Sequence, residues 1–238
     1  MRKAHSMKKR RLLIIAASAV AVLIAALAVV LIMNKDKPVE VNPKEIAVEN
    51  IEIDAATDGI SVVSIDSIAG MYVEDGTDEV LSDILAVTFR NDTDVTLQYA
   101  NLILTVGDED YTFELTTVPA DATVRVMEAD RKTLSSTKGD VTLSQENIAW
   151  FLEEPTLGEN DLKITPTNGA IIVENISGKT FAAPIYVYYK NYVDGVYVGG
   201  ITYRSGTKEE LKPGAEVALS AGHFDTEASQ IMFVTYAK

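Results

Sequence analysis

The chain has 238 residues, with 21 Lys and Arg against 35 Asp and Glu, no cysteine and a formal net charge of −14. This length is sufficient for one or two domains with a buried core, and the lack of cysteine excludes disulfide bonds, thiolate nucleophiles and cysteine-ligated metal centres. The two histidines, His5 and His223, lie far apart in sequence, and no phosphate-binding loop or dinucleotide fingerprint is present, so we expect neither a metal site nor a cofactor.

The N-terminal segment has the pattern of a membrane anchor. Residues 1–11 form a leader with six Lys and Arg and no acidic residue, and residues 12–33 are 22 residues without a charge. At ~1.5 Å per residue such a helix spans ~33 Å, enough to cross a lipid bilayer. Because basic residues beside a span stay in the cytoplasm, we predict a single-pass protein with a cytoplasmic leader and an extracytoplasmic body. A cleaved signal peptide is the alternative, although its apolar part is usually about 7–15 residues long.

The remainder of the chain is strongly acidic. It carries 15 Lys and Arg against 35 Asp and Glu, a net charge of −20. A body with this charge repels phosphate backbones, so we expect no binding to nucleic acid. Residues 34–45 combine Pro38 and Pro43 with many charged residues and predict a solvated linker between the membrane and the body.

The body reads as antiparallel strands. Leu85, Val87 and Phe89 fall on one face at a spacing of two residues, and similar alternation continues to about residue 127, with turn-type residues between the runs. Residues 46–155 are therefore predicted to form a first β-sandwich domain. Near its end, residues 144–152 favour a short helix with Ser144 as N-cap.

Strands resume after Pro155 and predict a second sandwich over residues 156–238. Asp194-Gly195 between two β-rich runs is a strong hairpin signal. The runs are 170–174, 184–190, 196–203, 216–221 and 230–236.

The two predicted domains share short patterns that indicate an internal repeat. Asn91-Asp92-Thr93 and Asn175-Ile176-Ser177 each follow an apolar strand, and Pro119 and Pro213 each precede one. These pairs are 84 and 94 residues apart, so the repeat requires insertions. We therefore predict two tandem immunoglobulin-like antiparallel β-sandwiches after an N-terminal transmembrane helix.

The second domain has a pattern of strands and turns carried by Asn175, Ser177, Gly178, residues 185–189, Asp194, Gly195, Leu211, Pro213 and Gly214. In this pattern it resembles the FxLYD-type family of bacterial extracytoplasmic domains. The resemblance covers about residues 162–238 and, more loosely, 80–134, although the Phe-x-Leu-Tyr-Asp string itself is not intact. It implies an immunoglobulin-like β-sandwich accessory module outside the cell, and not an enzyme.

Several patterns have both a functional and a structural interpretation. The Asn-x-Ser/Thr sequences are glycan acceptors in eukaryotic secretory proteins, but their recurrence in the repeat favours a turn closed by local hydrogen bonds. The acidic run 74–79 provides carboxylates of the kind that bind calcium, yet without EF-hand spacing it is more typical of an exposed turn.

Tyrosine is concentrated in one region, because six of the ten tyrosines fall between residues 186 and 203. On the strand 184–190, Ile185, Val187 and Tyr189 are expected to face the core, which leaves Tyr186 and Tyr188 on the other face. This pair is the candidate partner-binding site, with cross-strand packing as the structural alternative.

Binding rather than catalysis is the expected function. His223 is the only histidine after the leader, and no Gly-x-Ser-x-Gly or Ser-x-x-Lys motif accompanies it, so we expect no enzyme. The sequence predicts a protein anchored in the cell membrane of a bacterial, Gram-positive envelope that contacts an envelope protein. The alternative is a cell-wall glycan or small-ligand binding module that uses the tyrosine-rich face of the second domain.

Overall fold

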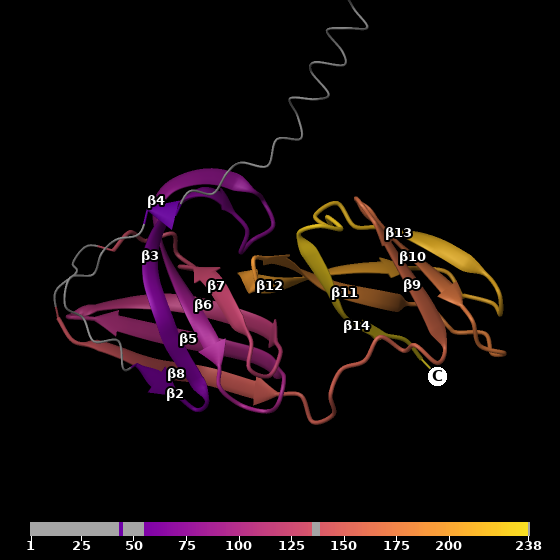
Figure 1. The fold of residues 1–238 in the computed structure, drawn as a ribbon, viewed down its shortest axis with the longest axis horizontal. Helices are drawn as coiled ribbons and strands as arrows, with labels where there is room; N and C mark the ends of the chain where they lie inside the picture. The colour runs from indigo at the N-terminus through magenta and orange to yellow at the C-terminus, as the bar shows by residue number, and fades with distance from the viewer. Residues whose placement is uncertain (1–42, 45–54, 135–138, 238) are drawn as a thin grey trace, which may run out of the picture. The chain divides into compact units, whose positions relative to one another are not determined.

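The computed structural model describes residues 43–44, 55–134 and 139–237, which belong to one compact part of the chain, residues 41–238. Every regular element in these ranges is a β-strand (Figure 1), which confirms the predicted all-β class. The predicted leader 1–11, the membrane segment 12–33 and most of the linker 34–45 lie outside the described residues. Among the described residues, no helix has the length and apolar character needed to cross a bilayer. The strands are β1 Pro43–Lys44, β2 Ala56–Thr57, β3 Ile60–Tyr72, β4 Glu79–Asn91, β5 Leu97–Val106, β6 Glu109–Val118, β7 Thr123–Met127, β8 Val141–Trp150, β9 Leu162–Thr167, β10 Ala170–Asn175, β11 Ile185–Val193, β12 Val196–Thr207, β13 Glu216–Ser220 and β14 Ser229–Thr235.

Two layers of strands enclose the core of the N-terminal half, residues 55–150. In one layer β4 lies between β3 and β7, and in the other β5 lies between β6 and β8. Because side chains alternate between the faces of a strand, a period-two pattern directs one set inward. Leu85, Val87 and Phe89, predicted to share a face, are fully buried in this core, and Phe89 meets Phe113 of the other layer edge-on at 5.3 Å.

The C-terminal half, residues 162–235, repeats this pairing order. There β10 lies between β9 and β13, and β11 lies between β12 and β14. A separate core forms from residues that include Ile171, Val173, Ile185 and Val187, all with no exposed surface. The predicted domain limits, 46–155 and 156–238, stay a prediction, but the same strand order on both sides of residue 155 is the structural counterpart of the repeat.

The helix predicted over residues 144–152 is wrong, because residues 144–150 belong to strand β8 and residues 151–152 follow its end. Strand β8 pairs with β5 from Val106↔Val141 to Leu97↔Trp150, with two register irregularities. A helix of about two turns is marginal in water, whereas the strand pairs with β5 from Val141 to Trp150. Leu143 is buried, and Ile148 and Trp150 pack against the N-terminal core, so tertiary packing overrides the local capping signal.

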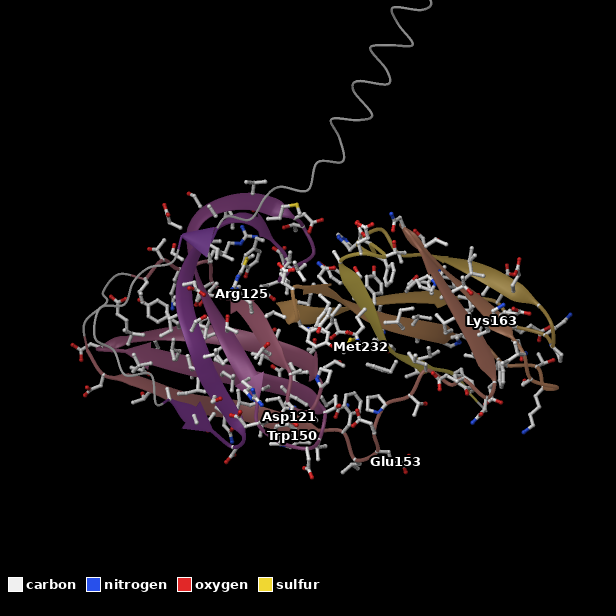
Figure 2. All side chains as sticks on the ribbon, viewed as in Figure 1. Asp121, Arg125, Trp150, Glu153, Lys163 and Met232 are labelled. Atoms are coloured by element: carbon white, nitrogen blue, oxygen red, sulfur yellow. The ribbon has the colours of Figure 1, made fainter. Side chains whose placement is uncertain are left out.

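One sheet continues from the N-terminal half into the C-terminal half. Strand β12 pairs with β11 on one side and, in parallel, with β7 on the other, at Tyr197↔Val124 and Val198↔Arg125. Figure 1 shows the end of β12 lying against β7 and β6. The core of the N-terminal half includes Tyr197, and Met232 of β14, labelled in Figure 2, packs against the same core. The two halves therefore share both a sheet and a core.

The long hairpin β3–β4 extends beyond the N-terminal core. Its outer part, with Met127 of β7, forms a small third core. The residues of this core include Ile68, Tyr72, Val73 and Ile84. The turn that follows Val73 is thereby held beside β12, where Glu74 accepts a hydrogen bond from Gly200.

Candidate functional site

Tyr186 and Tyr188 lie where the period of β11 predicts. Ile185, Val187 and Tyr189 are buried in the C-terminal core, and Tyr186 and Tyr188 are half-buried on the opposite face. The predicted alternation of this strand is therefore confirmed, although it does not by itself show that the face binds a partner.

The tyrosine pair belongs to a row of packed aromatic rings. The Tyr188 ring stacks on Phe233 of β14 at 4.2 Å, and Phe233 meets Phe151 edge-on at 5.6 Å. Tyr186 meets Tyr188 edge-on at 6.4 Å. Cross-strand packing thus holds the pair in a fixed position, as the structural alternative predicts.

A cation and a glycine complete this face. The guanidinium of the exposed Arg204 lies 4.5 Å from the centre of the Tyr186 ring. Gly206, directly across from Tyr186, has no side chain, and a Cβ there would clash with the tyrosine ring at 2.3 Å. We call Tyr186, Tyr188, Phe233 and Arg204 the aromatic face of the C-terminal half.

The other tyrosines of this region have structural partners. Tyr189 lies in the C-terminal core between Tyr203, stacked at 5.3 Å, and Phe224, edge-on at 5.3 Å. The Tyr197 hydroxyl donates to the side-chain carbonyl of Gln230 at 3.0 Å, and burial raises the pKa of Tyr197 to about 12. The concentration of tyrosine in sequence therefore serves several separate packing sites.

The asparagine of each repeat is a buried turn-closing residue. The Asn91 amide nitrogen donates to the carbonyls of Val95 at 2.9 Å and Val118 at 3.1 Å, and its oxygen accepts from the backbone N–H and the hydroxyl of Thr93. Asn91 is 1 % exposed. An amide whose hydrogens are donated inside the protein is not placed as a glycan acceptor, so the geometry favours the turn interpretation.

Asn175 makes the equivalent contacts in the C-terminal half. Its amide nitrogen donates to Lys179 at 2.7 Å and Leu211 at 2.8 Å, its oxygen accepts from Ser177, and it has no exposed surface. The acceptor Lys179 lies 84 residues after its counterpart Val95, and the acceptor Leu211 lies 93 residues after its counterpart Val118. The expected pairing of Pro119 with Pro213, at 94 residues, is therefore displaced by one residue.

The acidic run 74–79 uses its carboxylates within the protein. Asp75 and Glu79 each form an ion pair with Arg131 at 2.7 Å, and Asp78 lies 3.2 Å from His223 of the C-terminal half. Among the described residues, no group of three or more His, Asp or Glu is arranged to hold a metal ion.

Glu74 of the same run reaches across to β12. Its carboxylate accepts from the backbone N–H of Met127 at 2.8 Å and from that of Gly200 at 2.6 Å. Burial raises the pKa of the Glu74 carboxyl above its ordinary value, and these two N–H donors together with the nearby Lys190 ammonium oppose the rise.

Lys190 of β11 is a fully buried lysine. Its Nζ donates to the carbonyls of Ile201 at 2.8 Å, Gly200 at 3.0 Å and Thr116 of β6 at 3.0 Å. Three acceptors match the three N–H groups of an ammonium. Burial lowers the pKa of Lys190, and the negative charge of Glu74 opposes that effect.

The contacts that join Glu74, Gly200 and Lys190 were not predicted from the sequence. Two local signals were present: Lys190 follows five residues that are all apolar or aromatic, and Gly199-Gly200 interrupts a run of strand-forming residues. A glycine inside a strand often marks the close approach of another backbone. Neither signal, however, indicates which distant segment lies against these residues.

The protein was also compared with known families and proteins. No family model matches the chain, and no curated protein matches it.

Proposed function

We propose that this chain is a membrane-anchored, extracytoplasmic scaffold of a bacterial, Gram-positive envelope that acts by contacts with an envelope protein. In this proposal residues 12–33 cross the bilayer, and the body consists of two tandem immunoglobulin-like sandwiches of the FxLYD type. The repeated strand order and the equivalent Asn91 and Asn175 turns support the tandem arrangement. The basic leader and the uncharged segment support the anchor.

The aromatic face carries the binding part of the proposal. Tyrosine and arginine are enriched among the residues that dominate binding energy at protein interfaces, partly because aromatic rings lose little conformational freedom. Tyr186 and Tyr188 are already held by neighbouring rings, and Arg204 places a positive charge on an otherwise acidic body. A fixed aromatic face with a cation suits a partner surface that combines apolar and acidic groups.

A pull-down with a matched control tests this binding. The full chain is purified in detergent from its own membranes, as wild type and as the Tyr186→Ser/Tyr188→Ser variant, with Tyr192→Ser as the control. Tyr192 is an exposed tyrosine of the same strand, β11, and lies outside the aromatic face. We expect a stoichiometric protein partner to be retained by the wild type and the control and lost from the double variant. Equal retention by all three refutes the role of this face.

The same variants distinguish the glycan alternative. The wild type and the Tyr186→Ser/Tyr188→Ser variant are also applied to purified peptidoglycan. If the wild type is retained, the double variant is not, and the pull-down gives no protein partner, the aromatic face contacts the cell wall instead of a protein. Aromatic rings stack on sugars as well as on side chains, so the chemistry of the face permits both outcomes.

The absence of cysteine gives a direct test of the proposed topology. A single Ser6→Cys in the leader should be protected from a membrane-impermeant maleimide in intact cells, whereas Thr165→Cys on exposed β9 should react. Reaction of both positions, or release of the body into the medium, contradicts the anchored arrangement.

A further inference from the structure

The junction between the two halves is built around the hairpin β11–β12. Strand β12 pairs with β7, and Tyr197 from this hairpin lies in the N-terminal core. The Lys190 ammonium reaches Thr116 of β6, and the Thr116 hydroxyl donates to Gly200 at 2.8 Å. Backbone pairing, core packing and a buried charge therefore meet within a few residues.

Gly200 connects the two charged groups of the junction. Its N–H donates to Glu74 of the N-terminal half at 2.6 Å, and its carbonyl accepts from Lys190 at 3.0 Å. A Cβ at this position would lie 1.8 Å from the carbonyl oxygen of Glu114 in β6. Only glycine allows β12 to approach β6 so closely, and this approach brings the Thr116 carbonyl within reach of Lys190.

These contacts specify one position of β12 rather than adding much stability. Two opposite charges in the protein interior gain little overall, because their desolvation offsets their attraction. The geometry is nevertheless demanding, because the ammonium needs three carbonyls and the carboxylate needs two N–H donors at fixed places. A slip of the hairpin along β6 and β7 leaves both charges buried without these partners. Apolar packing alone imposes no such penalty, because apolar contacts are not directional.

We propose that Lys190, Glu74 and Gly200 form a latch that holds the two halves in a single relative position, so that the described body acts as one rigid element rather than two hinged domains. The proposal goes beyond the proposed function and does not depend on it. A further polar contact between the halves joins Asp78 to the partly exposed His223 at 3.2 Å, and it contributes less to this fixation because solvent screens it.

Distance measurements on the cysteine-free chain test the latch directly. Spin labels are attached to Asp108→Cys in the N-terminal half and Thr165→Cys in the C-terminal half, both exposed, in the full chain in detergent. The distance distribution is then measured by pulsed electron resonance. The latch variant is Glu74→Gln/Lys190→Met, which removes both charges together, and the control is Glu209→Gln/Lys208→Met, which makes the same changes at exposed positions.

The latch predicts one narrow distance peak for the wild type and the control. In the latch variant we expect circular dichroism to show an intact β fold, together with a broadened or two-peaked distance distribution. If the latch variant does not fold, the distance distribution is measured in Glu74→Gln alone, because this substitution preserves the side-chain shape and removes only the charge. A narrow distance distribution in the folded latch variant overturns the proposal. If that variant is unfolded, a narrow distance distribution in Glu74→Gln overturns it instead. A broad distance distribution in the wild type also overturns it.

Discussion

At the scale of single residues, a buried asparagine closes the equivalent turn in each half of this protein. Asn91 and Asn175 are almost fully buried, and each joins a strand end to two separate loops by hydrogen bonds. An asparagine suits this position because its amide both donates and accepts. The sequence already suggested a turn role for both residues, but only the fold shows which carbonyls they satisfy.

Replacement of Asn91 by Ala should destabilise the protein. The carbonyls of Val95 and Val118 lose their donor, and leaving buried polar groups unsatisfied costs about 1–3 kcal/mol. Urea unfolding measures the difference, with exposed Asp94→Ala as a control that should change little. Asn175→Ala should give a loss of similar size, and a negligible loss at both positions contradicts the role assigned to the amides.

The buried phenol of Tyr197 predicts a dependence on alkaline pH. Burial raises the pKa of Tyr197 to about 12, above the ordinary value of about 10, so the folded state binds its proton more tightly. Stability that is fully present below about pH 10 is therefore lost as the pH rises towards 12. Tyr197→Phe removes this contribution, and the midpoint of urea unfolding should fall less between pH 10 and 12 than in the wild type. Equal falls would show that the phenol ionises without penalty in the folded protein.

At the scale of secondary-structure elements, strand pairing overrides local preferences. Residues 144–152 carry a capping signal for a helix, but residues 144–150 form part of β8, because β5 offers both backbone partners and apolar neighbours. The hairpin β11–β12 shows the opposite case. Asp194-Gly195 predicts it, and both residues have the positive φ that two-residue hairpin turns require, 51° and 88°. A tight turn is a local property, whereas the pairing partner of a strand is not.

The close approach of β12 to β6 predicts a strong effect of Gly200→Ala. The added methyl group would overlap the Glu114 carbonyl at 1.8 Å, and overpacking of this kind costs typically about 1–3 kcal/mol or more. Gly178→Ala is the matched control, because it has open space around its Cβ position and no positive φ. Urea unfolding of both variants should show a large loss at Gly200 and little change at Gly178; similar values at the two positions contradict the close approach.

At the scale of the whole molecule, the shared sheet and the shared core predict joint unfolding of the two halves. Loss of the C-terminal half would remove Tyr197 and Met232 from the N-terminal core and expose Thr116 and β7. Calorimetry of the described body within the full chain should therefore show one transition, with the calorimetric enthalpy equal to the van't Hoff enthalpy. Two separate transitions would indicate that the junction couples the halves only weakly.

The sequence alone determined the properties that depend on local order and composition. Alternation of apolar residues predicted the all-β class and the inward faces of β4 and β11, and turn residues predicted the hairpin at Asp194-Gly195 and the asparagine turns. The membrane segment, the partner and the location outside the cell stay predictions. The tertiary structure decided what depends on contacts between distant residues: β8 as a strand, the parallel pairing of β12 with β7, and the burial of Lys190 beside Glu74. These contacts join positions up to 126 residues apart, as Glu74 and Gly200 show. No local period contains that information, because the free energy of such a contact depends on which surfaces the whole fold brings together.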